Sequence, residues 1–268
     1  MKKTAEENVA EFYNTAGWKM HGEVTEDAWA SEDFRECARE YISKCRLRVN
    51  RHIPESGENI LDMASGPIQY EEYLSFSKNY KRRYCVDLSQ DALDGAKEKI
   101  GNHGVYLQGS FFDIELDQNY FDCSISLHTI YHMDKNKQEQ AVRKLLYVTK
   151  PGKPVVIVYS NPRALIRIFL LPIRLVRAIL KKVKVSGKND GDLYFYRHPL
   201  DWWNQFSDEA VVQIYPWRSF STLHQKLLIP NNGLGKKIFD VIFKLEERFP
   251  NFFVRYFEYP MIVLTKKG

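Results

Sequence analysis

The sequence contains few cysteines and none of the spacings that hold a metal ion. Its 268 residues include four cysteines, Cys37, Cys45, Cys85 and Cys123, and no CxxC pair. The common zinc sites need closely spaced cysteine or histidine pairs, so this pattern predicts no metal centre. We interpret the four residues as free, buried thiols of a protein in a reducing compartment.

Long apolar runs and an apolar N-terminus are also missing. No stretch approaches the roughly 20 consecutive apolar residues that a membrane-spanning helix needs. Residues 1–8 are polar and lack the apolar core of a signal peptide, so we expect a cytoplasmic protein. Hydrophobic residues make up 44% of the chain and aromatic residues 14%, which excludes a mainly disordered chain.

Positive charge is concentrated in one segment. The formal net charge is +5, yet residues 163–188 alone carry eight basic residues and no acidic one. Most of them recur at helical spacing on one face, opposite apolar side chains, and Pro172 should kink or split the helix. Three interpretations stay open: a cap helix with a solvated basic face, a surface that contacts anionic lipid at the inner membrane, or a groove for RNA.

Strand and helix patterns alternate through the middle of the chain. Short apolar runs of this kind are typical of buried parallel strands, and helix-like segments separate most of them. The alternation predicts an α/β fold with a parallel sheet covered on both faces. Strands are expected at 60–62, 84–88, 105–108, 121–127, 155–159, 210–215 and 259–266, and helices at 5–13, 33–51, 70–77, 90–100, 135–148 and 234–248.

The most informative stretch is residues 59–66, Asn-Ile-Leu-Asp-Met-Ala-Ser-Gly. An apolar run ends in Asp62, and a tight turn through Gly66 leads into a helix-like segment, which is where open α/β sheets bind nucleotides. The next strand, 83–87, ends in Asp87, where a carboxylate can accept hydrogen bonds from both ribose hydroxyls. We interpret the pair as a nucleoside-binding site. The alternative, that both acids only cap the following helices, stays open.

Further motifs follow in a regular order. Residues 109–113 follow the third strand, the fourth strand leads into 128–133, and 149–152 precede the fifth strand. Over roughly 51–160, this succession resembles the class I S-adenosylmethionine-dependent methyltransferases, in their small-molecule (methyltransferase type 11-like) branch. The resemblance implies a doubly wound, Rossmann-like sheet of seven strands with the last strand antiparallel. It also implies S-adenosyl-L-methionine as the cofactor.

The resemblance assigns positions to the cofactor site. The loop 62–66 would approach the methionine and ribose moieties, Asp87 would hold the ribose hydroxyls, and the end of the fourth strand would face the methyl group. N-terminal aromatics, Tyr13 and Trp18, would fold over the cofactor. The cofactor-binding candidates are Tyr13, Asp62, Ala64, Gly66, Asp87, Leu88, Ser110, Phe111 and Leu127.

NAD is a poorer fit than S-adenosylmethionine. The NAD fingerprint uses three glycines so that the backbone can touch a pyrophosphate. Here Ala64 and Ile68 occupy two of the positions, and Pro67 removes an amide donor. A cofactor without phosphate tolerates these losses.

Methyl transfer from a sulfonium is an in-line displacement, in which the protein aligns the reacting atoms and excludes water. A hydroxyl acceptor would also need a general base, and His128 and His132 are the candidates because they follow the fourth strand. The Asn-Pro-Pro-Tyr motif of base methyltransferases is missing there, so nucleic acid is the weaker acceptor class. We expect transfer to an oxygen or nitrogen of a small-molecule or lipid-associated acceptor.

The expected organisation is one domain with additions. Residues 1–50 would form a helical segment that closes the cofactor site, and 51–160 the cofactor-binding core. Residues 161–209 would form a basic and aromatic insertion facing the acceptor or a membrane, and 210–268 would complete the sheet. The alternative function is a non-catalytic nucleoside-binding domain that docks on membrane or RNA through its basic helix.

Overall fold

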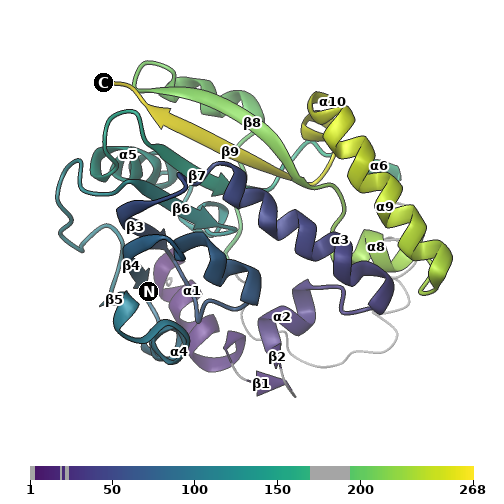
Figure 1. The fold of residues 1–268 in the computed structure, drawn as a ribbon, viewed down its shortest axis with the longest axis horizontal. Coiled ribbons are helices and arrows are strands. Elements are labelled where there is room, and N and C mark those ends of the chain that lie inside the picture. Colours follow the sequence, from purple (N-terminus) through teal and green to yellow (C-terminus); the bar gives the residue numbers. More distant parts are fainter. Residues whose placement is uncertain (1–3, 19, 22–23, 170–193) are drawn as a thin grey trace.

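A seven-stranded sheet forms the centre of the molecule (Figure 1). The computed structural model describes residues 4–18, 20–21, 24–169 and 194–268. The strand order is β5-β4-β3-β6-β7-β9-β8, and a separate two-stranded sheet pairs β1 with β2. β9 runs antiparallel to both of its neighbours, β7 and β8, whereas the pairs from β5 to β7 are parallel. The predicted doubly wound sheet with its last strand antiparallel is confirmed.

The elements have the following bounds. The strands are β1 (Met20–His21), β2 (Val24–Thr25), β3 (Gly57–Met63), β4 (Tyr80–Asp87), β5 (Gly104–Gln108), β6 (Cys123–Leu127), β7 (Pro154–Val158), β8 (Ala210–Arg218) and β9 (Tyr259–Lys266). The α-helices are α1 (Ala5–Phe12), α2 (Glu26–Ser31), α3 (Glu36–Leu47), α4 (Gln90–Ile100), α5 (Gln138–Val148), α6 (Ile166–Phe169), α8 (Thr222–Leu228), α9 (Gly233–Arg248) and α10 (Pro250–Tyr256). Shorter helical turns are η1 (Tyr13–Gly17), η2 (Arg48–Arg51), η3 (Glu71–Ser77), η4 (Gly101–His103), η5 (Ile130–His132) and η6 (Leu200–Phe206).

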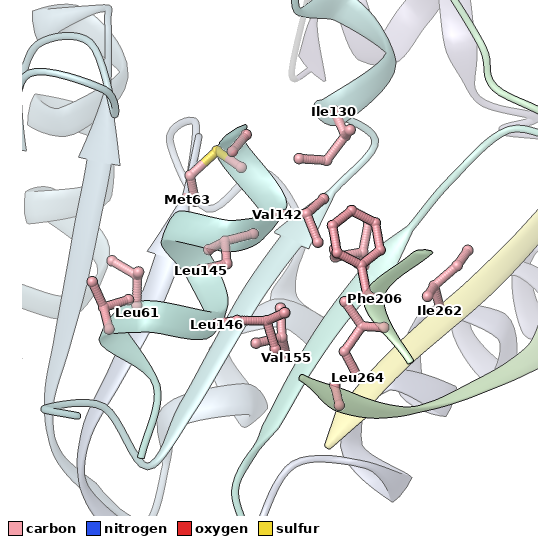
Figure 2. Close-up of a cluster of buried hydrophobic side chains, with 14 of the residues drawn as sticks. Leu61, Met63, Ile130, Val142, Leu145, Leu146, Val155, Phe206, Ile262 and Leu264 are labelled. Carbon is pink, nitrogen blue, oxygen red and sulfur yellow. The ribbon is translucent and has the colours of Figure 1, made fainter. Parts of the chain in front are cut away.

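The central strands are apolar on both sides because both faces of the sheet are covered. Successive side chains of a strand point to opposite faces, and in β3 Ile60 joins one buried cluster while Leu61 and Met63 join the other. Figure 2 shows the cluster that contains Leu61 and Met63, in which Leu146 of α5 lies next to Val155 of β7. The double coverage explains why these strands appear in the sequence as continuous apolar runs.

A buried ion pair joins α9 to η2, which continues α3. Arg48 Nη1 donates to Glu246 Oε2 at 2.8 Å and to the carbonyl of Trp217 in β8, also at 2.8 Å. Glu246 is fully buried and also accepts a hydrogen bond from the Tyr41 hydroxyl. Beside this pair, the rings of Tyr41 and Phe239 stack with their centroids 4.9 Å apart. The N-terminal helices are thereby fixed to the C-terminal part of the chain.

Several expected elements take another form. The helix expected at 70–77 is the 3-10 helix η3, and the loop expected at 12–18 contains the π-helical turn η1. The sequence patterns did not indicate the β1–β2 hairpin, α2, α8 or α10. Of the basic segment, only residues 163–169 are described, and the rest of that prediction lies outside the described residues. No helix in the described part of the chain is long and apolar enough to cross a membrane.

We expect Glu246→Leu to lower the free energy of unfolding by about 3 kcal/mol, because it removes the buried one of the two carboxylates that pair with Arg48 and leaves the Tyr41 hydroxyl without its acceptor. Urea unfolding followed by circular dichroism measures the change. The control is Glu139→Gln, which breaks an exposed pair with Arg143 and should cost less than about 1 kcal/mol. Equal midpoints for the two variants would show that the buried pair does not stabilise the fold.

Candidate active site

A pocket of about 270 Å³ lies at the carboxyl ends of β3, β4 and β6. α1 and η1 contribute to one part of its wall, and the ends of β8 and β9 contribute Arg218 and Tyr259 to another. Apart from Ser110, every site residue predicted from the sequence lines this pocket. These residues are Tyr13, Asp62, Ala64, Gly66, Asp87, Leu88, Phe111, Leu127, His128 and His132. The structure thus brings them together, and their individual roles stay predictions.

The loop after β3 has the backbone of a glycine-rich turn although it contains one glycine. The φ angles are 58° at Ala64, 55° at Gly66 and 50° at Ile68, all in the left-handed region. This conformation costs a non-glycine residue roughly 1–2 kcal/mol and is an outlier for a β-branched residue such as isoleucine. The Ala64 amide donates to the carbonyl of Val86 at 2.8 Å, so the neighbouring strand helps to hold the strained turn.

Two observations explain why residue 66 is a glycine. Besides its left-handed backbone, the ring of Trp18 lies too close to leave room for a side chain. A Cβ atom at this position would lie 2.8 Å from the Trp18 ring. Trp18 in turn stacks on Tyr13, with centroids 4.7 Å apart. The two aromatics predicted to fold over the cofactor therefore lie against the glycine turn.

Asp87 is held by backbone amides at the end of β4. Its Oδ2 accepts from Gly66 N and its Oδ1 from Ser89 N, each at 2.9 Å. Burial raises the pKa of the carboxyl to about 6, and the amide donors oppose that rise. The N-cap of α4 is Ser89, whose side chain accepts from Ala92 N, so Asp87 itself is not the helix cap.

Asp62 is paired rather than free. The Arg83 Nε donates to Asp62 Oδ2 at 3.1 Å, and both side chains are almost fully buried. Arg83 Nη1 also donates to the carbonyl of Tyr73 at 2.7 Å. Asp62 is not an N-cap, because the N-cap position of η3 is Tyr70. The pair joins β3 to β4 beside the pocket.

Ser110 differs from the expectation that it lies beside the adenine. It is missing from the pocket lining, and its hydroxyl donates to Glu6 Oε1 at 2.6 Å. Glu6, from α1, lines the pocket instead and also pairs with Lys137 at 3.2 Å. Asn8 Oδ1 accepts from the Tyr194 amide at 2.8 Å. α1 is therefore held in place from three directions.

His128 has a strained backbone and a neutral side chain. Its φ is 61°, a left-handed value that is uncommon outside glycine and is found often at functional sites. Its Nδ1 lies 3.0 Å from the Tyr131 hydroxyl, and its ring packs edge-on against Trp217. Burial, reinforced by the positive charge of Arg218, lowers the pKa of His128 to about 3.

His132 is also neutral, and its tautomer follows from its partner. Its Nδ1 lies 2.9 Å from the carbonyl oxygen of Tyr194 and must therefore be the donor. The other ring nitrogen, Nε2, then carries the lone pair. Burial lowers the pKa of His132 to about 4.

The far wall of the pocket contains residues that the sequence patterns did not indicate. Arg218 is 3% exposed, and its Nη1 donates to Glu32 Oε2 at 2.9 Å. Arg46 lies 3.4 Å from the same oxygen. Three tyrosines complete this wall, and none of their hydroxyls forms a hydrogen bond with another described residue: Tyr70, Tyr73 and Tyr259. The sequence offered only a weak indication of this wall. Arg218 ends an apolar strand, and Glu32 lies shortly before a helix.

Metal binding finds no support in the described part of the chain, where no three potential His, Cys, Asp or Glu ligands cluster. The four cysteines are buried and unpaired.

We expect Ala64→Val to lower the free energy of unfolding by about 1–2 kcal/mol, because a β-branched residue fits a left-handed position poorly. Ala64→Gly should leave stability unchanged or raise it. Thermal unfolding of both variants and of the unchanged protein gives the order of their stabilities. At an ordinary position, glycine in place of alanine costs roughly 0.5–1 kcal/mol, so a loss of that size for Ala64→Gly would contradict a strained turn.

Comparisons with known proteins agree with this geometry. Residues 61–157 match the family described as methyltransferase domain. No curated protein matches the sequence. Several solved structures share the fold, although their sequences are less than 20% identical to this one.

One is the geranyl diphosphate C-methyltransferase of Streptomyces coelicolor A3(2), with a TM-score of 0.56, 17% identity and 98% of each chain covered. A second is an S-adenosylmethionine-dependent methyltransferase from Archaeoglobus fulgidus, with a TM-score of 0.53, 18% identity, and 85% of this chain and 94% of that one covered. A third is phosphoethanolamine N-methyltransferase 2 of Haemonchus contortus, in complex with S-adenosylhomocysteine. Its TM-score is 0.56 and its identity 12%, over 100% of this chain and 61% of that one.

The strand order, the strand-end acids and the matched domain agree with one another. Residues 61–157 form a methyltransferase domain, and the chain has the fold of the class I S-adenosylmethionine-dependent methyltransferases.

Proposed function

We propose that this enzyme transfers a methyl group to an oxygen or nitrogen of a small-molecule or lipid-associated acceptor in the cytoplasm, by in-line displacement. The observation that carries the proposal is the single pocket that contains both Asp87 and the far wall around Tyr259. One end has groups suited to a nucleoside, and the other has room and polar groups for an acceptor.

The residues at the first end fit S-adenosylmethionine. Each oxygen of Asp87 accepts one amide hydrogen and keeps a lone pair that ribose hydroxyls can use. Leu88 and Phe111 offer apolar surface for the base, and Tyr13 and Trp18 cover the turn at Gly66. When bound, the cofactor supplies a methyl group already activated by its sulfonium.

The residues between the two ends would orient the nucleophile. His128 and His132 follow β6 and line the pocket beside Leu127. Because both imidazoles stay neutral, each can accept a hydrogen bond from a hydroxyl or an amine. Their low pKa values disfavour full proton removal before methyl transfer. We therefore assign them to aligning the acceptor and taking its proton only as the new bond forms.

The far wall favours a polar acceptor group. Tyr70, Tyr73 and Tyr259 line the pocket together with Arg218 and Glu32, which form an ion pair. The similar structures include a C-methyltransferase and an N-methyltransferase, so the fold alone does not select the nucleophile. The three tyrosines and the Arg218–Glu32 pair of this wall are what support oxygen or nitrogen here.

Incubation with S-adenosylmethionine and panels of amines, phenols and extracted lipids tests the proposal, with S-adenosylhomocysteine as the measured product. Calorimetric titration with S-adenosylhomocysteine tests the cofactor site separately, with NAD as the control. Asp87→Ala should lose both binding and turnover. A non-catalytic docking domain would show no product with any acceptor class.

We expect the affinity for S-adenosylhomocysteine to be constant above about pH 7 and to fall as the pH drops through about 6. The protonated Asp87 carboxyl loses acceptor capacity for the ribose, so the loss should approach tenfold for each pH unit below 6. The two histidines titrate below this window. Calorimetry between pH 5 and pH 8 measures the change.

Asp87→Asn is the matched control for this titration. It should bind more weakly at pH 8 and show a flat profile. The same pH dependence in this variant would place the titrating group elsewhere.

We expect His128→Asn to reduce turnover at least about tenfold while the affinity for S-adenosylhomocysteine changes little. Asparagine tolerates the left-handed backbone, so this substitution removes the imidazole without adding strain. Single-turnover rates of the variant and of the unchanged enzyme are compared, with the acceptor that the screen identifies. Tyr131→Phe, which removes only the hydroxyl next to Nδ1, should have a smaller effect. Unchanged turnover in His128→Asn would refute the assignment.

A further inference from the structure

The outer side of α9 and α10 exposes a continuous apolar stripe. Leu234, Val241 and Leu245 are 61%, 55% and 40% exposed, and their spacing of seven and four residues places them on one side of the helix. Phe249 and Phe252, each 53% exposed, follow at the junction with α10. Single exposed apolar residues are ordinary, but five along one stripe are typical of a binding surface.

The opposite side of α9 accounts for the helix's place in the fold. Phe239 and its neighbours pack against α3 in a buried cluster that contains Tyr41 and Ile42. Figure 1 shows α9 and α10 along one edge of the molecule, with α3 on their inner side. The exposed stripe is therefore not needed to hold α9 on the domain.

Cations border the stripe on one side. Lys237, Lys244 and Arg248 repeat the spacing of seven and four residues, which places them on the flank next to the apolar side chains. All three are exposed, and none forms an ion pair with a residue that the structure describes. Of the three acids of α9, Glu246 is buried and Glu247 pairs with Arg48 and Arg51. Asp240, one helical turn from Lys237 and from Lys244, lies 3.8 Å from Lys44 of α3.

Two exposed aromatics lie near the pocket wall. Trp29 and Phe34 are 51% and 43% exposed, and their rings stack 6.2 Å apart. They flank Ser31 and Glu32, which line the pocket. Arg35 Nη1 donates to the carbonyl of Ile229 at 2.7 Å, which holds this connection against the end of α8, just before α9. Exposed apolar side chains thus occur both on α9 and beside the pocket.

We propose that the outer side of α9 and α10, the interfacial face, docks on an anionic lipid bilayer. Amphipathic helices that lie on membranes combine an apolar stripe with lysine and arginine beside it, as this face does. The cores of protein–protein interfaces are instead depleted in lysine. Docking would bring the pocket to acceptors dissolved in the bilayer, a part of the inference that rests on the proposed function.

The test is co-sedimentation of the full chain with vesicles, in the presence of S-adenosylhomocysteine. Vesicles of phosphatidylcholine alone are compared with an equal mixture of phosphatidylcholine and phosphatidylglycerol. We expect binding to the mixed vesicles, lowered about 100-fold by a triple change of Lys237, Lys244 and Arg248 to glutamine, since each cation near such a surface contributes roughly 1 kcal/mol. A double change of Val241 and Leu245 to serine should weaken binding to the same vesicles.

The matched control changes three exposed lysines away from this face, Lys78, Lys97 and Lys135, to glutamine. It alters the net charge equally and should leave binding largely intact. Equal loss in both triple variants would overturn the proposal, because net charge alone would explain binding. So would a stripe that pairs two copies of the chain, seen as a dimer lost in the Val241/Leu245 variant. Unchanged affinity for S-adenosylhomocysteine in all variants keeps a failed docking surface distinct from a failed cofactor site.

Discussion

The hydrogen bond from the Gly66 amide to Asp87 joins the ends of two neighbouring parallel strands, and the pocket depends on it. The Gly66 amide points at Asp87 because the chain turns through left-handed conformations at residues 64, 66 and 68. Two of these three residues are not glycines, so the turn is held by its surroundings rather than by local preference. The surroundings are β4, through the Val86 carbonyl, and the buried pair of Asp62 with Arg83. Strain is stored at the place where the cofactor is expected to bind.

Buried ion pairs connect the two ends of the chain around this sheet. Arg218 and Glu32 are 186 residues apart in sequence, and Arg48 and Glu246 are 198 apart, yet each pair is almost fully buried. Such pairs contribute little net stability compared with apolar packing, but breaking one is costly. They therefore specify which segments meet. In this chain, they hold the segment after α2 and the end of β8 together at the far wall of the pocket.

The sequence was sufficient for the sheet and for the residues at one end of the pocket, for a physical reason. Strands buried on both faces leave continuous apolar runs, and the acids at their ends follow directly in sequence, so Asp62, Asp87 and His128 were found together. The far wall of the pocket was not found, because Glu32, Tyr70 and Arg218 meet only through tertiary contacts. Residues 71–77 were predicted to be helical, but not to form a 3-10 helix. In so short a segment, the spacing of apolar residues does not distinguish a 3-10 helix from an α-helix.

Tyr194, the first described residue after Phe169, connects the cover of the pocket to its interior. Its amide donates to Asn8 of α1, and its carbonyl accepts from His132 Nδ1. Its hydroxyl accepts from the Lys135 amide near the start of α5. One backbone position therefore fixes both the helix that covers the site and the tautomer of a histidine inside it. The position of α1 and the hydrogen bond of His132 therefore depend on the same backbone segment.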